Sequence, residues 1–401
     1  MKRLALLVVI GLVFCGKAAE AQLIMTMSNG WSFSFSGNVN AFGVYTKQNN
    51  SGPSNFSIRT GLLPGFANFE AKGKEGGQNL AVHFGFAPQI NNAGVHDNFG
   101  NGTQAGAQID MREVYLTVGA AWGQMLVGRE LALFGRQNIL QDQTLFGVGA
   151  VGIGAGQGGG TTLGRIGYGY IYPNFEAQAT YTTKTGVPAQ LAIGIFQPSV
   201  LGTPGSPNAF AVTPLPRLEA EFTYNMKSGA RKWLLWAGGL VQTASNAPTN
   251  GQSITSTGLT AGVRGDISAL SVVVSGYIGS GLGTLLMFSG VAGGPVASTD
   301  SAARKSDGGY LQVGYALTKK TSIFGSYGLS RLKNAGSGEA AGANGGPDAL
   351  RTQLSSYTGG VYHQWTKSVK LSAEVTQEHQ QGIATPSASQ LDISAGILLF
   401  F

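Results

Sequence analysis

The sequence has one cysteine, few charged residues and, beyond its N-terminus, no long hydrophobic run. Cys15 is the only cysteine among 401 residues, and it lies in an N-terminal segment that we expect to be removed. The mature chain therefore forms no internal disulfide and no thiolate metal site. Only 11% of the residues are charged, against about 25% in typical soluble domains. This composition is unusual for a cytosolic enzyme.

After the N-terminal segment, no stretch reaches the roughly 18 apolar residues that a membrane-spanning helix requires. The mean hydropathy is only +0.07. The 63 glycines indicate many tight turns or close backbone contacts. A β-barrel in a membrane gives this composition, because apolar and polar residues alternate along each strand and cancel in the average.

The N-terminus has the three parts of a secretory signal peptide. Two basic residues precede the apolar segment Leu4–Cys15, which is too short to span a bilayer, and an Ala-Glu-Ala cleavage site ends at Ala21. A lipoprotein anchor is disfavoured because the bulky Phe14 precedes Cys15. We predict a signal peptide over residues 1–21 and a mature chain over residues 22–401. The short apolar core also disfavours a permanent membrane anchor.

Alternation with a period of two dominates the mature sequence. In 217–226, for example, apolar residues at even positions alternate with polar residues at odd positions, which places one class on each face of a strand. About sixteen segments show this pattern, most of them long enough for a tilted membrane strand. They are 31–46, 57–74, 79–90, 108–119, 124–130, 174–184, 189–198, 216–226, 233–244, 254–265, 271–280, 307–317, 321–333, 351–365, 370–380 and 389–401.

The connections between these segments alternate between short and long, as in outer-membrane barrels. The longest covers residues 131–173. Leu163–Tyr172 is itself strand-like, but a strand there would break the alternation, so we place it within this long loop. All five tryptophans lie near short connections, which predicts an aromatic girdle at one membrane interface. The chain ends on a strand whose last residue is Phe401. The whole pattern predicts an all-β fold, a transmembrane antiparallel barrel of about sixteen strands.

Three stretches resemble the general porins of Gram-negative bacteria, which are trimeric and sixteen-stranded. They are Arg59–Phe66, Asp110–Leu116 and Met125–Glu130. The resemblance implies that the third long loop, 131–173, folds into the lumen and constricts it. It also implies a homotrimer in the lipid of the outer membrane. The sequence departs from the family in this loop, where the glycine-rich run Phe146–Gly152 replaces an acidic segment.

Selectivity in such a channel depends on pore width and on charges that face each other across the constriction. The resemblance implies that Arg59 and Arg112 form the basic side, and Asp142, the only acid in 131–173, would face them. Charged residues on a lipid-facing wall cost a few kcal/mol, so charges within strands should point inward. The predicted pore-lining set is Arg59, Arg112, Arg129, Glu130, Arg136, Asp142, Arg217 and Glu219.

The function predicted from the sequence is passive diffusion of small hydrophilic solutes and ions across the outer membrane. Cleavage after Ala21 removes three basic residues and one acid, so the net charge falls from +7 to +5. With four arginines facing one aspartate, we expect a mild anion preference. No catalytic residue, cofactor or metal is predicted: the four histidines are scattered, without metal-ligand spacing.

Three alternatives remain open at this stage. The first is a substrate-specific channel of the same architecture. The second is a barrel hydrolase, for which His379 with Glu374 and Glu378 is the best candidate site. The third is a secreted β-rich adhesin, which would purify without detergent. A nucleotide site at the G-x-G-x-x-G stretch Gly147–Gly152 is disfavoured because no helical period follows it. Basic patches interleaved with aromatics, as nucleic-acid binding requires, are absent.

Overall fold

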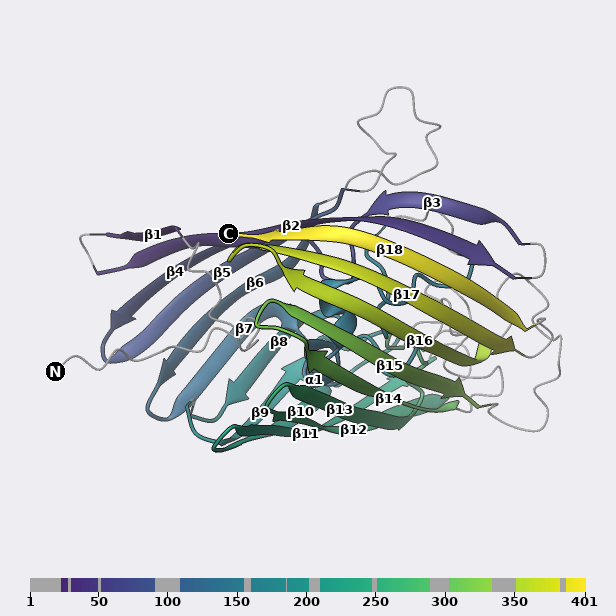
Figure 1. Ribbon diagram of the computed structural model, residues 1–401. Helices are drawn as coiled ribbons and strands as arrows, with labels where there is room; N and C mark the ends of the chain where they lie inside the picture. The colour runs from purple at the N-terminus through teal and green to yellow at the C-terminus, as the bar shows by residue number, and fades with distance from the viewer. Residues whose placement is uncertain are drawn as a thin grey trace, which may run out of the picture.

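The computed structural model describes residues 23–27, 30–49, 52–90, 109–154, 160–184, 186–201, 210–246, 251–288, 303–333, 351–382 and 387–401. The predicted signal peptide, residues 1–21, lies outside these ranges. One antiparallel sheet contains every strand in the described ranges (Figure 1).

The strands follow the predicted segments closely. They are β1 (Leu23–Thr26), β2 (Ser32–Gln48), β3 (Ser54–Arg59), β4 (Phe66–Glu75), β5 (Gln78–Pro88), β6 (Ile109–Ala120), β7 (Gly123–Leu131), β8 (Phe175–Thr182), β9 (Ala189–Phe196), β10 (Arg217–Ser228), β11 (Arg231–Ser245), β12 (Ser253–Ile267), β13 (Leu270–Ser280), β14 (Lys305–Ala316), β15 (Thr321–Leu332), β16 (Arg351–Gln364), β17 (Val369–Gly382) and β18 (Ala388–Phe400).

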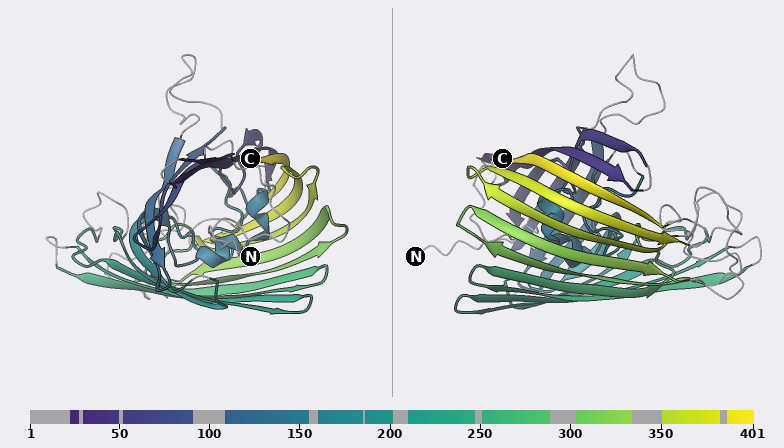
Figure 2. Two further views of the ribbon diagram at one scale, coloured as in Figure 1. Left: turned by 90° about the vertical axis from the view of Figure 1, so that its left-hand side faces the viewer. Right: turned by 45° about the vertical axis from the view of Figure 1, so that its right-hand side comes forward.

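The sheet closes on itself. Except at the break between β3 and β4, each strand pairs with the next along the chain, and the last strand, β18, pairs with β2. Counting β3 and β4 as one interrupted strand, the wall contains sixteen antiparallel strands, as predicted. The end-on view in Figure 2 shows the resulting ring. Closure removes free sheet edges, which cannot be tolerated in lipid. Among the described residues, no helix is long and apolar enough to cross a membrane.

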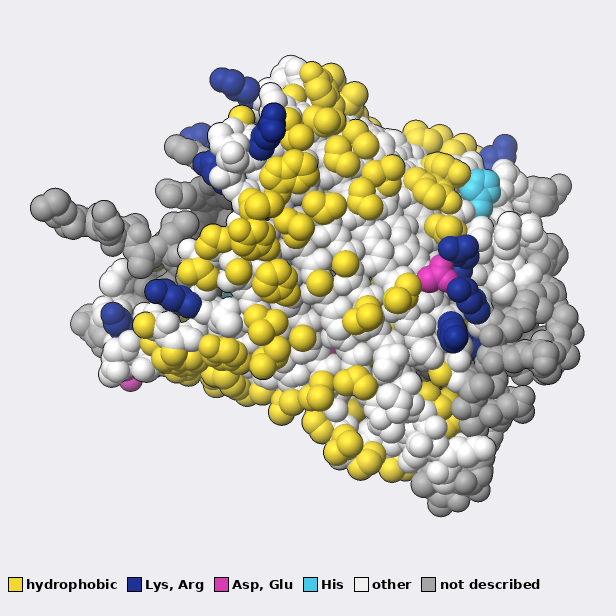
Figure 3. All heavy atoms as spheres, turned by 90° about the horizontal axis from the view of Figure 1, so that it is seen from below, with side chains coloured by type: hydrophobic (Ala, Val, Ile, Leu, Met, Phe, Trp, Pro, Cys, Tyr) yellow, Lys and Arg dark blue, Asp and Glu magenta, His cyan; other side chains and the backbone are white. Residues whose placement is uncertain are grey.

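The period-two pattern separates an apolar outer face from a polar inner face. On β10, Leu218 is 49% exposed and Phe222 is 43% exposed, whereas Arg217, Glu219 and Glu221 are all buried. Figure 3 shows one side of the outer surface, where hydrophobic side chains spread over a broad area and most charged ones lie toward its edges. The barrel is thus apolar outside and polar inside, the arrangement of a wall between lipid and an aqueous lumen.

The second wall strand is interrupted, which corrects the prediction of one continuous segment over 57–74. β3 pairs with the C-terminal part of β2, residues 42–47, and β4 pairs with its N-terminal part, residues 32–38. Residues 60–65 leave the sheet between them. Two of their N–H groups donate instead to the long loop, Leu62 to the Gly147 carbonyl (2.9 Å) and Leu63 to the Leu145 carbonyl (3.2 Å). Pro64 has no N–H to give to a ladder. The break is stabilised by a partner far away in the sequence.

A short strand that the sequence analysis did not predict, β1, helps to complete the wall. β1 pairs with Ser32–Phe35 of β2, whereas β18 pairs with the rest of β2 from Asn38 onward. The C-terminal Phe401 exchanges two backbone hydrogen bonds with Gly37, of 2.8 and 3.0 Å. The first and last strands therefore lie end to end against the same neighbour.

The predicted tryptophan girdle is wrong for one of its members. Trp122 and Trp365 are 44% and 58% exposed near short turns, as expected for interfacial indoles. Trp236, by contrast, faces the lumen and is only 3% exposed. Its indole N–H donates to the side chain of Asn138 at 2.8 Å. Position along a strand was predicted correctly, but the indole belongs to the inner face.

Candidate functional site

The described residues between β7 and β8, 132–154 and 160–174, lie inside the barrel. They include the short helix α1 (Arg136–Leu140) and the 3-10 turn η1 (Gln143–Phe146), and Figure 2 shows α1 within the ring of strands. The hydroxyl of Tyr310 on β14 donates to the Asn138 carbonyl at 2.8 Å. Tyr362 on β16 donates to the Gln143 carbonyl at 2.7 Å. The loop is therefore fixed to the inner face of the wall.

Apolar side chains of this loop form a packed core within the barrel, which we call the interior core. Its buried loop members include Ile139, Leu145 and Ile166, and they pack with wall residues such as Phe42 and Val273. An apolar core in a space that solvent would otherwise fill narrows the lumen. Burial of these side chains also stabilises the loop, by about 1.5–3 kcal/mol for each large one.

The glycine-rich run binds two carboxylates of β17 through its backbone. The N–H groups of Val148 and Gly149 donate to one oxygen of Glu374 at 2.9 and 2.7 Å. Those of Val151 and Gly152 donate to one oxygen of Glu378 at 2.7 and 3.0 Å. Successive amides often form such anion-binding concavities. Here the bound anions are the side chains of Glu374 and Glu378 on a wall strand, so the glycine-rich run attaches the loop to the wall.

Asp142 does not face the lumen, which corrects the prediction that it forms the acidic side of an eyelet. Its side chain has no exposed area. One oxygen accepts from the N–H and hydroxyl of Thr144, and the other accepts from the Arg165 N–H and the Tyr170 hydroxyl. Burial raises the pKa of Asp142, and the nearby Arg165 opposes that rise. Asp142 therefore organises the loop internally.

Arg165 was not identified from the sequence, yet it joins the loop to two wall strands. It is fully buried, and its guanidinium donates to Ser326 on β15 and to the hydroxyl and carbonyl of Ser356 on β16. No local pattern marks this arginine, since its partners lie more than 150 residues away.

Four predicted residues form a buried ionic network where the loop leaves β7. Arg136 of α1 binds Glu221 of β10 at 2.6 Å and lies 3.9 Å from Glu130. Arg217 binds Glu219 at 2.8 Å, and Glu219 also accepts the Phe134 N–H at 2.8 Å. The inward placement of these residues is as predicted. Neither Arg217 nor Glu219 lines the inner cavity, however. Glu219 contacts the loop at Phe134, whereas the Arg217 guanidinium lies over the rings of Phe196 and Phe288.

Arg59 also lies on the inner face, and it is only 3% exposed. Its guanidinium donates to the carbonyls of Gly160 and Thr161 at 3.1 and 3.3 Å, so it too fastens the loop. Arg129 is in register with Val114 and Ala177 on the outward side of β7, opposite in phase to Glu130. The prediction that both neighbours line the lumen is therefore wrong for Arg129.

Arg112 reaches the lumen through a β-bulge. The pairing of β5 with β6 shifts between Gly85 and Phe86, which leaves Arg112 as the extra residue between Met111 and Glu113. Its guanidinium binds Asp110 at 3.0 Å and stacks on the Phe175 ring, with 5.5 Å to the centroid. The sequence pattern placed Arg112 and Glu113 on opposite faces. The bulge instead lets both border one cavity, as bulges commonly redirect side chains.

The cavity that remains beside the loop has a volume of about 530 Å³. Its wall on β4, β5 and β6 carries acids and bases in pairs: Lys72 with Glu70 at 2.6 Å, and His83 with Glu113 at 2.8 Å. These four residues were missed as site candidates. The alternation in 66–75 already placed Glu70 and Lys72 on the polar face, so a signal was present.

Lys72, Arg112 and Arg136 are the basic residues at this cavity, apart from His83, and Glu70, Glu113 and Glu130 are the acidic ones. The formal charges around it therefore balance. The predicted set of four arginines facing one aspartate is not assembled. Among the described residues, no group of three or more histidine, aspartate or glutamate side chains is arranged to hold a metal ion.

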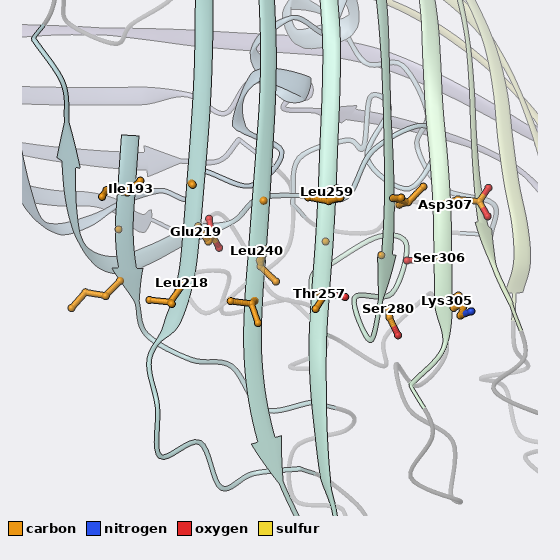
Figure 4. Close-up of a pocket in the computed structure, with 18 of the residues that line it drawn as sticks. Ile193, Leu218, Glu219, Leu240, Thr257, Leu259, Ser280, Lys305, Ser306 and Asp307 are labelled. Carbon is orange, nitrogen blue, oxygen red and sulfur yellow. The ribbon is translucent and has the colours of Figure 1, made fainter. Parts of the chain in front are cut away.

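A second, larger hollow of about 970 Å³ opens on the outer wall over β9–β14 (Figure 4). Its exposed side chains, including Leu218 and Leu259, belong to the outward phase of their strands. Polar residues such as Lys305 and Asp307 also line it, but its exposed apolar side chains point away from the lumen. We therefore assign the channel to the inner cavity.

The candidate site for the hydrolase alternative, His379 with Glu374 and Glu378, is not formed. His379 lies on the outward phase of β17, exposed and in edge contact with the Tyr357 ring. Glu374 and Glu378 lie on the inward phase and are both buried under the loop. An acid and a base on opposite sides of the wall cannot share a substrate.

No protein-family model and no curated protein matches the sequence. Solved structures do match over nearly the full length. The outer-membrane channel DcaP of Acinetobacter baumannii superposes with a TM-score of 0.68 at 13% identity, over 94% of this chain and 99% of that one. The fold is that of an outer-membrane porin. OmpF of Salmonella typhi matches with a TM-score of 0.56 at 12% identity, over 94% and 100% of the two chains. OprB of Pseudomonas putida matches with a TM-score of 0.55 at 10% identity, over 92% and 94%.

Proposed function

We propose that this porin-fold protein is a passive channel of the Gram-negative outer membrane. The observation that carries the proposal is a closed wall, apolar outside and polar inside, with a solute-sized cavity left beside an in-folded loop. Small hydrophilic solutes and ions would cross through this cavity. No step of bond chemistry is required, since permeation depends on the width and charge of the passage.

We further propose that the passage has little preference between anions and cations. The mild anion preference expected from the sequence depended on an excess of arginines at the pore, with Arg59, Arg112, Arg129 and Arg136 facing the single acid Asp142. Arg59 and Asp142 are buried in loop contacts, and Arg129 is on the outward phase. The balanced charges at the cavity favour a reversal potential near zero in a salt gradient.

The first experiment is electrical. Purified protein reconstituted in a planar bilayer should give stepwise KCl conductance, and a tenfold KCl gradient should give a reversal potential within about 10 mV of zero, well short of the ~59 mV limit for one monovalent ion. Absence of conductance steps would refute the channel. A strong reversal potential of either sign would refute only the weak selectivity.

We also propose a homotrimer whose subunit contact includes an aromatic patch on the outer face. The rings of Phe35 and Phe69 are in tilted contact with centroids 4.9 Å apart, and those of Phe35 and Phe401 with centroids 5.1 Å apart. Phe33 and Phe86 extend the patch. Aromatic side chains are enriched at protein interfaces. A solved OmpT of Vibrio cholerae with this fold is described as a trimer form.

A further inference from the structure

The cavity beside the loop has two chemically different sides. One side consists of the paired charges on β4, β5 and β6. The other is the edge of the interior core, where Phe66, Leu140, Leu163, Tyr172 and Phe400 are only partly buried. Inorganic ions gain nothing from such an apolar surface because they stay hydrated, whereas a solute with an apolar part gains from contact with it.

The apolar side is formed by residues of the in-folded loop and by a residue next to the interruption of the wall strand. Leu140 and Leu163 belong to the in-folded loop, and Phe66 opens β4 directly after the interruption of the wall strand. The interior core behind them holds these side chains in place. They therefore offer a fixed apolar surface that a solute can contact as it passes.

The charged side carries two close acid–base pairs. Lys72 and Glu70 are 2.6 Å apart, and His83 and Glu113 are 2.8 Å apart. A solute with one charge must pull one partner away from the other and leave a charge uncompensated. A zwitterion can place its negative group against the basic partner and its positive group against the acidic partner at the same time. No charge of the pair is then left uncompensated.

From these two sides we propose that the passage favours zwitterionic solutes with an apolar body, of which apolar amino acids are the simplest. The inference rests on the proposed channel function and specifies its solute class. Apolar contact and paired charges act on different parts of such a solute, so each contribution can be removed separately.

The test compares solutes of nearly equal size in proteoliposomes. Radiolabelled leucine and asparagine share the zwitterionic group and differ in the polarity of the side chain. We expect leucine to enter about fivefold faster, equivalent to ~1 kcal/mol, after correction for leakage into protein-free liposomes. The double variant Leu140→Asn, Leu163→Asn should bring the ratio close to one. Leu234→Asn is the matched control, since Leu234 packs on the same interior core away from the cavity, and it should keep the ratio.

The charge requirement is tested with leucine against 4-methylpentanoate and 3-methylbutylamine, which carry the same body with one charge each. Leucine should be the fastest of the three. Equal rates for leucine and asparagine in the wild type, or an unchanged ratio in the double variant, would overturn the apolar contact. Faster entry of either singly charged solute would overturn the role of the ion pairs. KCl conductance is recorded on every sample, so a protein that forms no channel at all is recognised separately.

Discussion

Gly147 has no space for even a methyl group. A Cβ at this position would overlap the carboxylate of Glu374, the group that accepts the N–H groups of the two following residues. A glycine here lets the backbone approach the wall closely enough for those bonds. Attachment of the loop thus requires that residue 147 has no Cβ. The Glu374 side chain on β17 cannot move away without breaking its hydrogen bonds to the N–H groups of Val148 and Gly149.

Gly147→Ala should therefore loosen the loop without unfolding the wall. Overpacking of this kind costs about 1–3 kcal/mol, and we expect larger fluctuations of the open-channel current and faster proteolytic cutting within 131–173. Gly325→Ala is the control, since a Cβ there meets no atom within 4 Å. Currents as quiet as those of the control would contradict the proposed anchoring.

Some site residues could be predicted from the sequence and others could not. Arg217 and Glu219 follow from alternation, because a regular strand fixes the face of every second residue. Arg112 escapes this rule through a bulge that only the pairing with β5 reveals. The burial of Asp142 depends on Arg165 and Tyr170, whose positions result from how the loop folds back. Contacts between distant segments leave no periodic signal.

At the scale of the element, the strands were predictable because their pattern is set by two surroundings, lipid on one face and the lumen on the other. The interruption at 60–65 was not predictable, since its N–H groups find partners in the loop. The glycine and proline residues of this stretch were visible in the sequence. Nothing local showed that they mark a break and not the end of a strand.

The outward phase of β12 gives a direct test of membrane exposure. Leu259 is 62% exposed near the middle of this strand. Leu259→Arg should destabilise the barrel in lipid vesicles by about 2–4 kcal/mol, because a charge at the bilayer midplane is costly. Thr255→Arg, on the same face near the end of the strand, should cost only about 0–1 kcal/mol. Urea unfolding followed by tryptophan fluorescence measures both, and equal costs would show that this face does not meet the lipid interior.

At the scale of the whole molecule, the wall and the interior core have different functions. The closed ring makes the protein a membrane barrel, and the core inside it decides how much of the lumen stays open. The ring was predicted from the sequence. Of the interior core, the sequence predicted only that the loop folds inward. Its apolar packing and the buried ionic network were not predicted, since both depend on which strands the loop contacts.

Assembly belongs to this scale as well. If the aromatic patch forms the subunit contact, Phe35→Ser with Phe69→Ser should convert trimers to monomers in native electrophoresis and chemical cross-linking, with per-channel conductance retained. Phe222→Ser with Tyr224→Ser is the control, since both side chains lie on the outer face of β10, away from the patch. Loss of trimers in the control and not in the first variant would place the contact elsewhere.

The meeting of Phe401 with Gly37 has a consequence for biogenesis. β18, the strand that seals the cylinder, follows all the other wall strands in the chain, and it docks on β2, at the beginning of the wall. A polypeptide without β18 cannot close the sheet, so closure must await the synthesis of that strand. A change that blocks the contact between Phe401 and Gly37 would then hinder the sealing step itself, even if every other hairpin had already formed.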